Sequence, residues 1–240
     1  PLVGMILGSI SAVLLPVFSG MDKGDGMSNE TLVVWNSALL KSAKLIFPML
    51  IFSVFFAEPI MTCMYGDIYA QSSIYFVIKN LSGLFYIIPF YPIILAIGKT
   101  NSYANAHMIA AFMIVMAEYV VCKTFDSAVY VAITSELCKL FKIWLLLRVI
   151  ANYAHKKITE LLPPRPMTIL IMISVLASLP PFLLLDFLNM NKFIVLFVCL
   201  GFFLVDYYVL CWICKVTYRD IAGGFLKNKS RLNAVVKILP

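Results

Sequence analysis

Long apolar runs separated by short polar stretches dominate the pattern along this chain. A helix that crosses a hydrocarbon layer of ~30 Å needs about 17–25 predominantly apolar residues, and most of the runs reach or approach that length. The pattern predicts an all-α polytopic membrane protein with about five to seven membrane helices, including a long, tilted or horizontal helix hairpin toward the C-terminus. The predicted spans cover residues 2–18, 45–65, 69–97, 108–122, 167–187 and 192–218.

One further helix is predicted from residue 127 to residue 162, because this stretch contains neither Pro nor Gly. At 1.5 Å per residue it would measure about 54 Å, which exceeds the hydrocarbon thickness and requires a strong tilt or a partly horizontal course. The prolines at 163, 164 and 166 are expected to end it. Shorter polar segments predict a loop at 19–30, an interfacial amphipathic helix at 31–44 and a turn at 99–106.

These segments indicate a single membrane domain over residues 1–240 with no separate soluble part. Within it we distinguish an N-terminal span with its interfacial segment (1–44), middle helices (45–122), a long helical hairpin (127–220) and a basic tail (221–240). Glu58 precedes Pro59 inside the second run, where a kink would free backbone groups.

Composition supports a membrane location. Hydrophobic residues make up 62% of the chain and charged residues 13%, against roughly a quarter charged in soluble domains. The net charge of +7 comes from basic residues near the ends of apolar runs, where they set topology and attract anionic lipids such as cardiolipin. No basic stretch has the length or exposed aromatics expected for nucleic-acid binding. The chain carries no motif of a soluble enzyme, and we expect no cofactor and no bound metal.

Arg148 is the main candidate for function, since its nearest charged neighbours in the sequence are Lys142 and Lys156. An arginine at membrane depth is costly and is usually functional or paired, although it can also snorkel to the interface. Asn152 and His155 follow at i+4 and i+7, so on a continuous helix the three side chains share one face. An imidazole titrates near physiological pH, so such a face could relay protons; it could equally pack against a partner helix.

Carboxylates inside apolar runs are the second group of candidates. Asp206 lies between Phe202-Phe-Leu-Val and Tyr-Tyr-Val-Leu, and Glu118 and Glu136 lie in the fourth span and in the long helix. A buried carboxylate is either neutralised by desolvation or paired with a cation, and both states suit a proton path.

The residues around Arg148 resemble subunit a of the F-type rotary ATP synthases, with Leu147-Arg148-Val-Ile-Ala-Asn152 similar to the stretch around the essential arginine of that family. Two further patches occur in the same order: Asn80-Leu-Ser-Gly-Leu84 with Pro89 soon after, and the run from Asp206 to Asp220, which is similar to the final helix of the family. His155 comes two residues earlier than the family's histidine or acid, and Asp206 replaces an amide.

The resemblance implies a divergent mitochondrial member located in the inner membrane, acting as the proton-translocating subunit without ATP chemistry of its own. Its partners would be the c-ring proteolipid, peripheral-stalk and other membrane subunits, lipids and protons. Arg148 would separate two aqueous half-channels at the c-ring, and Asn152, His155, Asp206, Glu136 and Glu118 would line the proton pathway.

Two other functions remain open from the sequence. Glu58-Pro59 and the proline-containing third run are compatible with a self-contained cation channel or secondary transporter, for example one resembling a trimeric intracellular cation channel. A structural membrane subunit of a respiratory complex is the third alternative, in which the polar residues would only pack.

Overall fold

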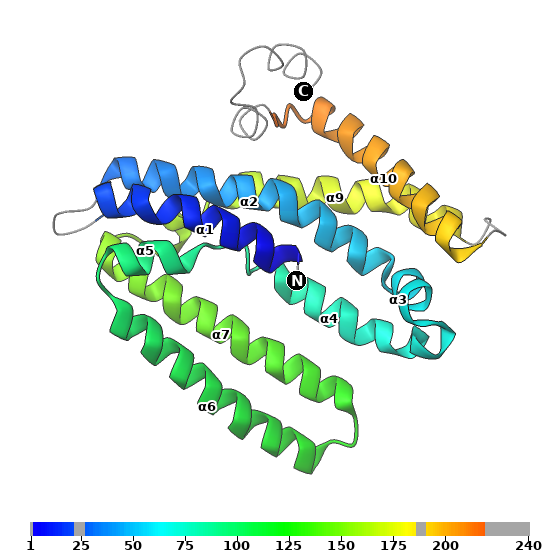
Figure 1. Ribbon diagram of the computed structural model, residues 1–240, viewed down its shortest axis with the longest axis horizontal. Helices are drawn as coiled ribbons and strands as arrows, with labels where there is room; N and C mark the ends of the chain where they lie inside the picture. Colours follow the sequence, from blue (N-terminus) through cyan, green and yellow to red (C-terminus); the bar gives the residue numbers. More distant parts are fainter. Residues whose placement is uncertain (1, 22–26, 186–190, 219–240) are drawn as a thin grey trace.

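The structure, a computed structural model, describes residues 2–21, 27–185 and 191–218, all of whose regular elements are helical (Figure 1). The all-α fold class is therefore confirmed. In chain order the elements are α1 (Leu2–Met21), α2 (Asn29–Phe55), α3 (Ala57–Tyr65), the short 3-10 helix η1 (Asp67–Ser72), α4 (Ser73–Gly83), α5 (Phe90–Ala96), α6 (Thr100–Thr124), α7 (Ala128–Ala154), α8 (Ile158–Leu161), α9 (Pro164–Leu184) and α10 (Lys192–Ile213).

Five of the described helices are long and apolar enough to cross a membrane, namely α1, α2, α6, α9 and α10. The protein is thus an integral membrane protein by the length and composition of its helices. The helix that carries Arg148, α7, is long enough but holds four charged side chains, at Glu136, Lys139, Lys142 and Arg148. It is not among the five.

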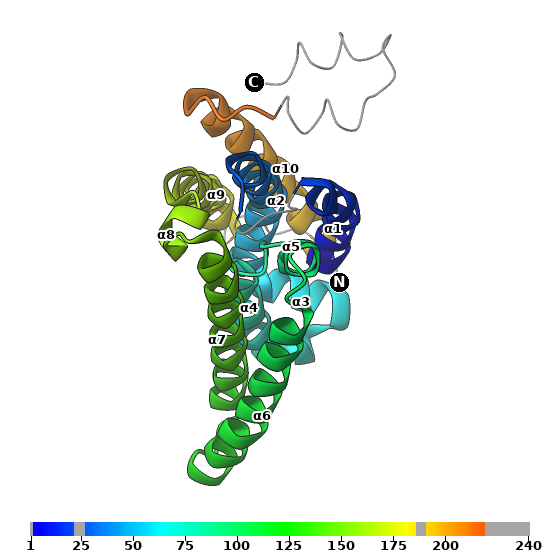
Figure 2. The same cartoon turned by 90° about the vertical axis from the view of Figure 1, so that its left-hand side faces the viewer.

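The helices lie in tiers. Helices α2 and α9 pack together near the centre, α10 packs on α9 at one side, and α4 and α7 lie at the other side with α6 outermost (Figures 1 and 2). Helix α1 packs on α5 and α2. The larger apolar core lies between α1, α2, α5, α7 and α9 around Trp35, Ile46 and Ile150, and a second cluster around Phe56 and Phe203 joins α2 to α9 and α10.

Helix α2 corrects two sequence predictions. The segment 31–44 is not a separate interfacial helix but the first half of α2, which Ser28 caps by accepting a hydrogen bond from the Thr31 amide at 3.1 Å. Its polar residues Thr31 and Ser42 are fully buried, because they face the core while their hydroxyls are hydrogen-bonded within the protein. The second predicted span, 45–65, is not continuous either, because α2 ends at Phe55 and α3 begins at Ala57, shortly before Pro59.

The third predicted span, 69–97, is not continuous. It forms η1, α4 and α5, with an irregular connection at 84–89 and Pro89 as the residue before α5. The polar stretch 99–106 is not a turn either, because the chain turns at Gly98 (φ 68°) and α6 begins at Thr100. Glycine suits this left-handed backbone because it has no Cβ.

The predicted 36-residue helix is wrong in its length. Helix α7 ends at Ala154, and His155 adopts a left-handed conformation (φ 51°) that stops the helical hydrogen bonding. The Lys156 amide then donates to the Ala151 carbonyl at 3.1 Å, as in a common type of helix C-terminus. Four residues form the short α8 before Pro163 and α9 follow.

The predicted hairpin 127–220 is divided between two packing units. Helix α7 pairs with α6 and also contacts α4, whereas α9 pairs with α10 and α2. Residues 219–240, which include Arg219, Asp220 and the basic tail 221–240, lie outside the described residues.

Candidate functional site

Arg148 lies on an exposed face of α7. Exposed side chains recur along this helix at spacings of three, four or seven residues, which places them on one side of the helix. We call this face the outward stripe, and it consists of Tyr130, Leu137, Phe141, Trp144, Arg148 and Asn152. The guanidinium carbon of Arg148 lies 5.3 Å from the centre of the Trp144 ring. No carboxylate of the described residues is within ion-pair distance of Arg148. Its positive charge therefore contacts the Trp144 ring but has no counter-ion among these residues.

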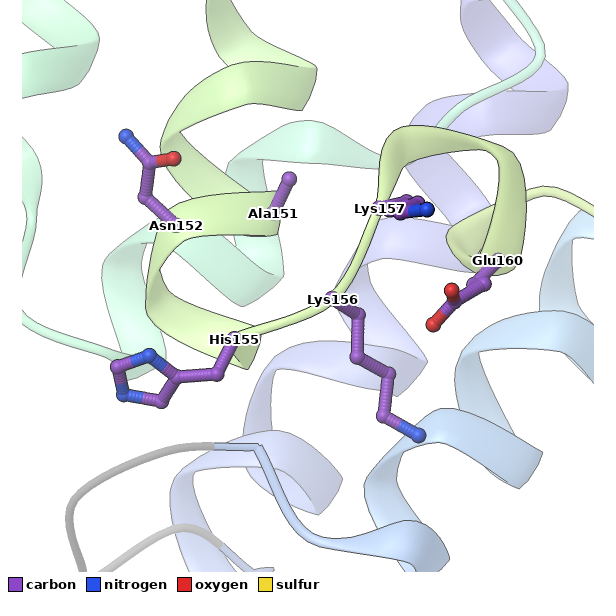
Figure 3. A pocket seen from close by; sticks show the side chains of 6 residues that line it. All are labelled: Ala151, Asn152, His155, Lys156, Lys157 and Glu160. Atoms are coloured by element: carbon purple, nitrogen blue, oxygen red, sulfur yellow. The ribbon is translucent and has the colours of Figure 1, made fainter.

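Asn152 and His155 line an open surface pocket of about 480 Å³ at the C-terminal end of α7, together with Ala151, Lys156, Lys157 and Glu160 (Figure 3). The side chains of Asn152 and His155 leave the backbone on the same side in Figure 3. The predicted i, i+4, i+7 alignment of a continuous helix does not hold for His155, because the helix ends before it. Both side chains are nevertheless exposed, and they stand at the end of the stripe that carries Arg148.

Glu136 occupies the opposite side of α7 and is buried, with 8% of its surface exposed. One carboxylate oxygen, Oε1, accepts hydrogen bonds from Lys139 Nζ at 2.7 Å and from Lys79 Nζ at 3.3 Å. The other, Oε2, accepts one from the Ser82 hydroxyl at 2.6 Å. A buried carboxylate is stable when its charge is paired and its oxygens are hydrogen-bonded, and both conditions are met here. Because Lys79 and Ser82 belong to α4, this group joins α4 to α7.

Glu118 and Asp206 lie apart from one another. Glu118 is half-buried on α6, close enough to Cys138 of α7 for its charge to act on the thiol. Asp206 is half-buried on α10, which packs on α9, α3 and α2. Figures 1 and 2 place α10 and α7 on opposite sides of the α2–α9 pair. Asp206 is thus not brought next to Arg148.

The sequence prediction missed the residues that complete the inner side of α7. Lys79 and Ser82 come from a helix more than fifty positions before Glu136, so no local pattern could find them. Lys139 did carry a signal, since it stands three residues after Glu136 on the same helix and could be expected to pair with it. Lys142 follows Lys139 by three residues on α7 and lines a cavity together with Tyr86 and His107.

No protein-family model, no curated protein and no solved structure matches this chain.

Proposed function

We propose that the protein translocates protons across a membrane as the stator subunit of a rotary ATP synthase, with the outward stripe of α7 turned toward the c-ring. The observation that carries the proposal is the position of Arg148. It is an arginine on an exposed helix face whose other members, apart from Asn152, are apolar or aromatic, and the described residues supply no carboxylate for it. A charge in such surroundings is costly unless a partner of opposite sign meets it. A carboxylate carried past on a neighbouring subunit would be that partner.

The chemistry follows from the side chain. Arginine keeps its proton even when water is removed from it, whereas a desolvated lysine can become neutral. A permanent positive charge lowers the energy of an ionised carboxylate beside it and repels a proton that would cross directly. The stacking of Arg148 on Trp144 fixes the position of the guanidinium without neutralising it.

Other candidate residues take different places in this proposal. The open pocket at Asn152 and His155 would give water and protons access to one end of the outward stripe. Glu136 and Glu118 would belong to the inner side of α7, where Glu136 is already paired with lysines. Asp206, on the other side of the molecule, would not act on Arg148 directly. In this function the protein would lie in the mitochondrial inner membrane and carry out no ATP chemistry itself.

The test is to extract the native protein in mild detergent and to identify by mass spectrometry what co-migrates with it. Co-migration of a small two-helix proteolipid and of catalytic ATPase subunits would support the stator function. Recovery of the protein without either, in a preparation from which the intact ATP synthase is also recovered, would contradict it.

A self-contained cation channel or transporter is the second candidate, because of one observation. The polar side chains at the α4–α7 boundary, with Lys79, Ser82 and Glu136 in contact, form an ionic group inside this single chain. An ion pathway formed by a single chain needs polar groups inside that chain, whereas a stator subunit needs them at the surface that meets the c-ring. Co-migration of copies of this chain alone, together with cation flux in liposomes that contain only this protein, would favour the channel. Co-migration with respiratory-complex subunits would favour a structural role instead.

A further inference from the structure

A second, smaller cavity lies on the inner side of α7, between α1, α5 and α6, with a volume of about 170 Å³. Hydrophobic residues such as Leu7, Ile143 and Leu146 form part of its wall. The polar side chains that line it are Ser11, Tyr86, Tyr91, Tyr103, His107 and Lys142. Every one of these can donate a hydrogen bond, and no carboxylate is among them.

Lys142 has no hydrogen-bond or ion-pair partner in the described part of the chain. The charges that act on it are those of Lys139 and Lys79, which are both positive. The only carboxylate nearby in the inner group, Glu136, already accepts hydrogen bonds from those two lysines and from Ser82. Glu136 is thus shared by Lys139 and by Lys79, whose side chain is 63% exposed, and the charge of Lys142 is left uncompensated.

Three of the aromatic side chains that line the cavity contact one another, although Tyr91 is 52% exposed and His107 is also exposed. The Tyr103 ring lies 4.5 Å from the His107 ring and 6.0 Å from the Tyr91 ring, measured between centroids. The hydroxyl of Tyr86 stands near enough to Glu136 for the two groups to interact electrostatically. Within the described residues the hydroxyls of Tyr86, Tyr91 and Tyr103 have no hydrogen-bond partner. The cavity therefore offers a half-buried ammonium group and several hydroxyl donors without an acceptor.

We propose that this cavity binds an oxyanion of the phosphate class, either the phosphomonoester headgroup of a lipid or free inorganic phosphate, with Lys142 as its charged partner. A phosphate oxyanion would balance the uncompensated charge of Lys142 and would accept hydrogen bonds from the surrounding hydroxyls. Its size suits a cavity of this volume, which has room for one such group but not for a large headgroup. The proposal is independent of the stator function, since it concerns the inner side of α7 and requires no partner subunit.

Thermal unfolding of the full chain in a mild, uncharged detergent tests the site. The probes are dioctanoyl phosphatidic acid, dioctanoyl phosphatidylcholine and inorganic phosphate. A ligand that binds only the folded state at ten times its Kd should raise the Tm of a chain of this size by about 3–6 °C. We expect this rise with phosphatidic acid and not with phosphatidylcholine. A rise with inorganic phosphate as well would identify a free ion as a sufficient ligand, whereas a rise with the lipid alone would identify the headgroup as the source.

Lys142→Met keeps an unbranched side chain that is one atom shorter and removes its charge. In this variant the phosphatidic acid-dependent rise should disappear, and the Tm without ligand should not fall, because an unpaired charge has been removed. Lys142→Arg should retain the rise. Lys123→Met, an exposed lysine at the end of α6 and outside the cavity, is the matched control and should behave as the wild type.

Tyr86→Phe provides an independent check that leaves every charge in place. Loss of one hydroxyl donor should weaken the affinity for phosphatidic acid about fivefold. The proposal is overturned if neither phosphate probe raises the Tm of the wild type, or if Lys142→Met keeps the full rise.

Discussion

Glu136 is predicted to be sensitive to substitution, because its carboxylate joins two helices. Glu136→Ala removes the 2.6 Å hydrogen bond from Ser82 and the 2.7 Å ion pair with Lys139. Hydrogen bonds to charged groups are worth about 1.5–3 kcal/mol each, and the removal of one partner of a buried pair costs about 3–5 kcal/mol. The Lys79 side chain is 63% exposed, so its contribution is small. We expect a loss of about 3 kcal/mol in the free energy of unfolding.

Thermal unfolding in detergent measures this effect. For a chain of 150–250 residues each kcal/mol changes the Tm by about 2–4 °C, so Glu136→Ala should lower it by about 6–12 °C. The Tm of Glu136→Gln should lie between those of Glu136→Ala and the wild type. The glutamine amide oxygen can still accept the hydrogen bond from Ser82, but the side chain carries no charge.

Glu118→Ala is the matched control for the Glu136 variants. It removes a half-buried carboxylate that has no hydrogen-bond or ion-pair partner among the described residues, and it should not lower the Tm. An unchanged Tm in Glu136→Ala, or equal losses in both alanine variants, would refute the conclusion that the paired carboxylate stabilises the contact between α4 and α7.

Two further substitutions test the packing of α2. Trp35→Phe removes the buried hydrogen bond from the indole Nε1 to the Leu161 carbonyl (3.0 Å) and should cost about 1–3 kcal/mol, while Trp212→Phe at an exposed position should leave the Tm unchanged. Equal Tm values for the two variants would show that the bond to α8 adds nothing. Gly83→Val would place a Cβ 3.1 Å from a leucine side chain of α2 and should lose about 1–3 kcal/mol more than Gly201→Val, where a Cβ meets no atom within 4 Å. A smaller loss at 83 than at 201 would contradict the tight contact.

Run length and hydrophobicity were sufficient to predict most membrane helices, because a helix in lipid must satisfy its own backbone and be apolar outside. The predictions for α9 and α10 agree with the structure to within a few residues at their N-terminal ends. The prediction failed at α2, where Thr31 and Ser42 are polar in sequence but lie in the core. The Thr31 hydroxyl is hydrogen-bonded to the Ser28 hydroxyl, and the Ser42 hydroxyl donates to the Ala38 carbonyl one turn earlier, and average hydropathy does not record such bonds.

The end of α7 could not be predicted from local sequence. No Pro or Gly marks it, and His155 adopts a left-handed backbone conformation that is uncommon for residues other than glycine. The short helix that follows is held by a tertiary contact, the hydrogen bond from Trp35 to Leu161, across 126 positions. Spacing alone therefore placed His155 on a continuous helical face that the structure interrupts.

The candidate site was predicted in part. Helical periodicity predicts that Arg148 and Asn152 share one face of α7, and the structure places them on one face; that this face is exposed was not predicted. Which residues on α4 pair with Glu136, and how far Asp206 lies from α7, depend on which helices pack together. Apolar runs of similar composition do not reveal which helices will be neighbours.

Replacement of the central arginine tests the main functional proposal most directly. In vesicles that contain the native complex, ATP-driven proton uptake would be measured for the wild type, for Arg148→Gln and for Arg165→Gln, an exposed arginine at the start of α9. Membrane insertion of each variant would be verified by its resistance to carbonate extraction. We predict that Arg148→Gln is inserted but has lost coupled proton uptake, while Arg165→Gln retains it. Wild-type coupling in an inserted Arg148→Gln variant would contradict the role proposed for Arg148.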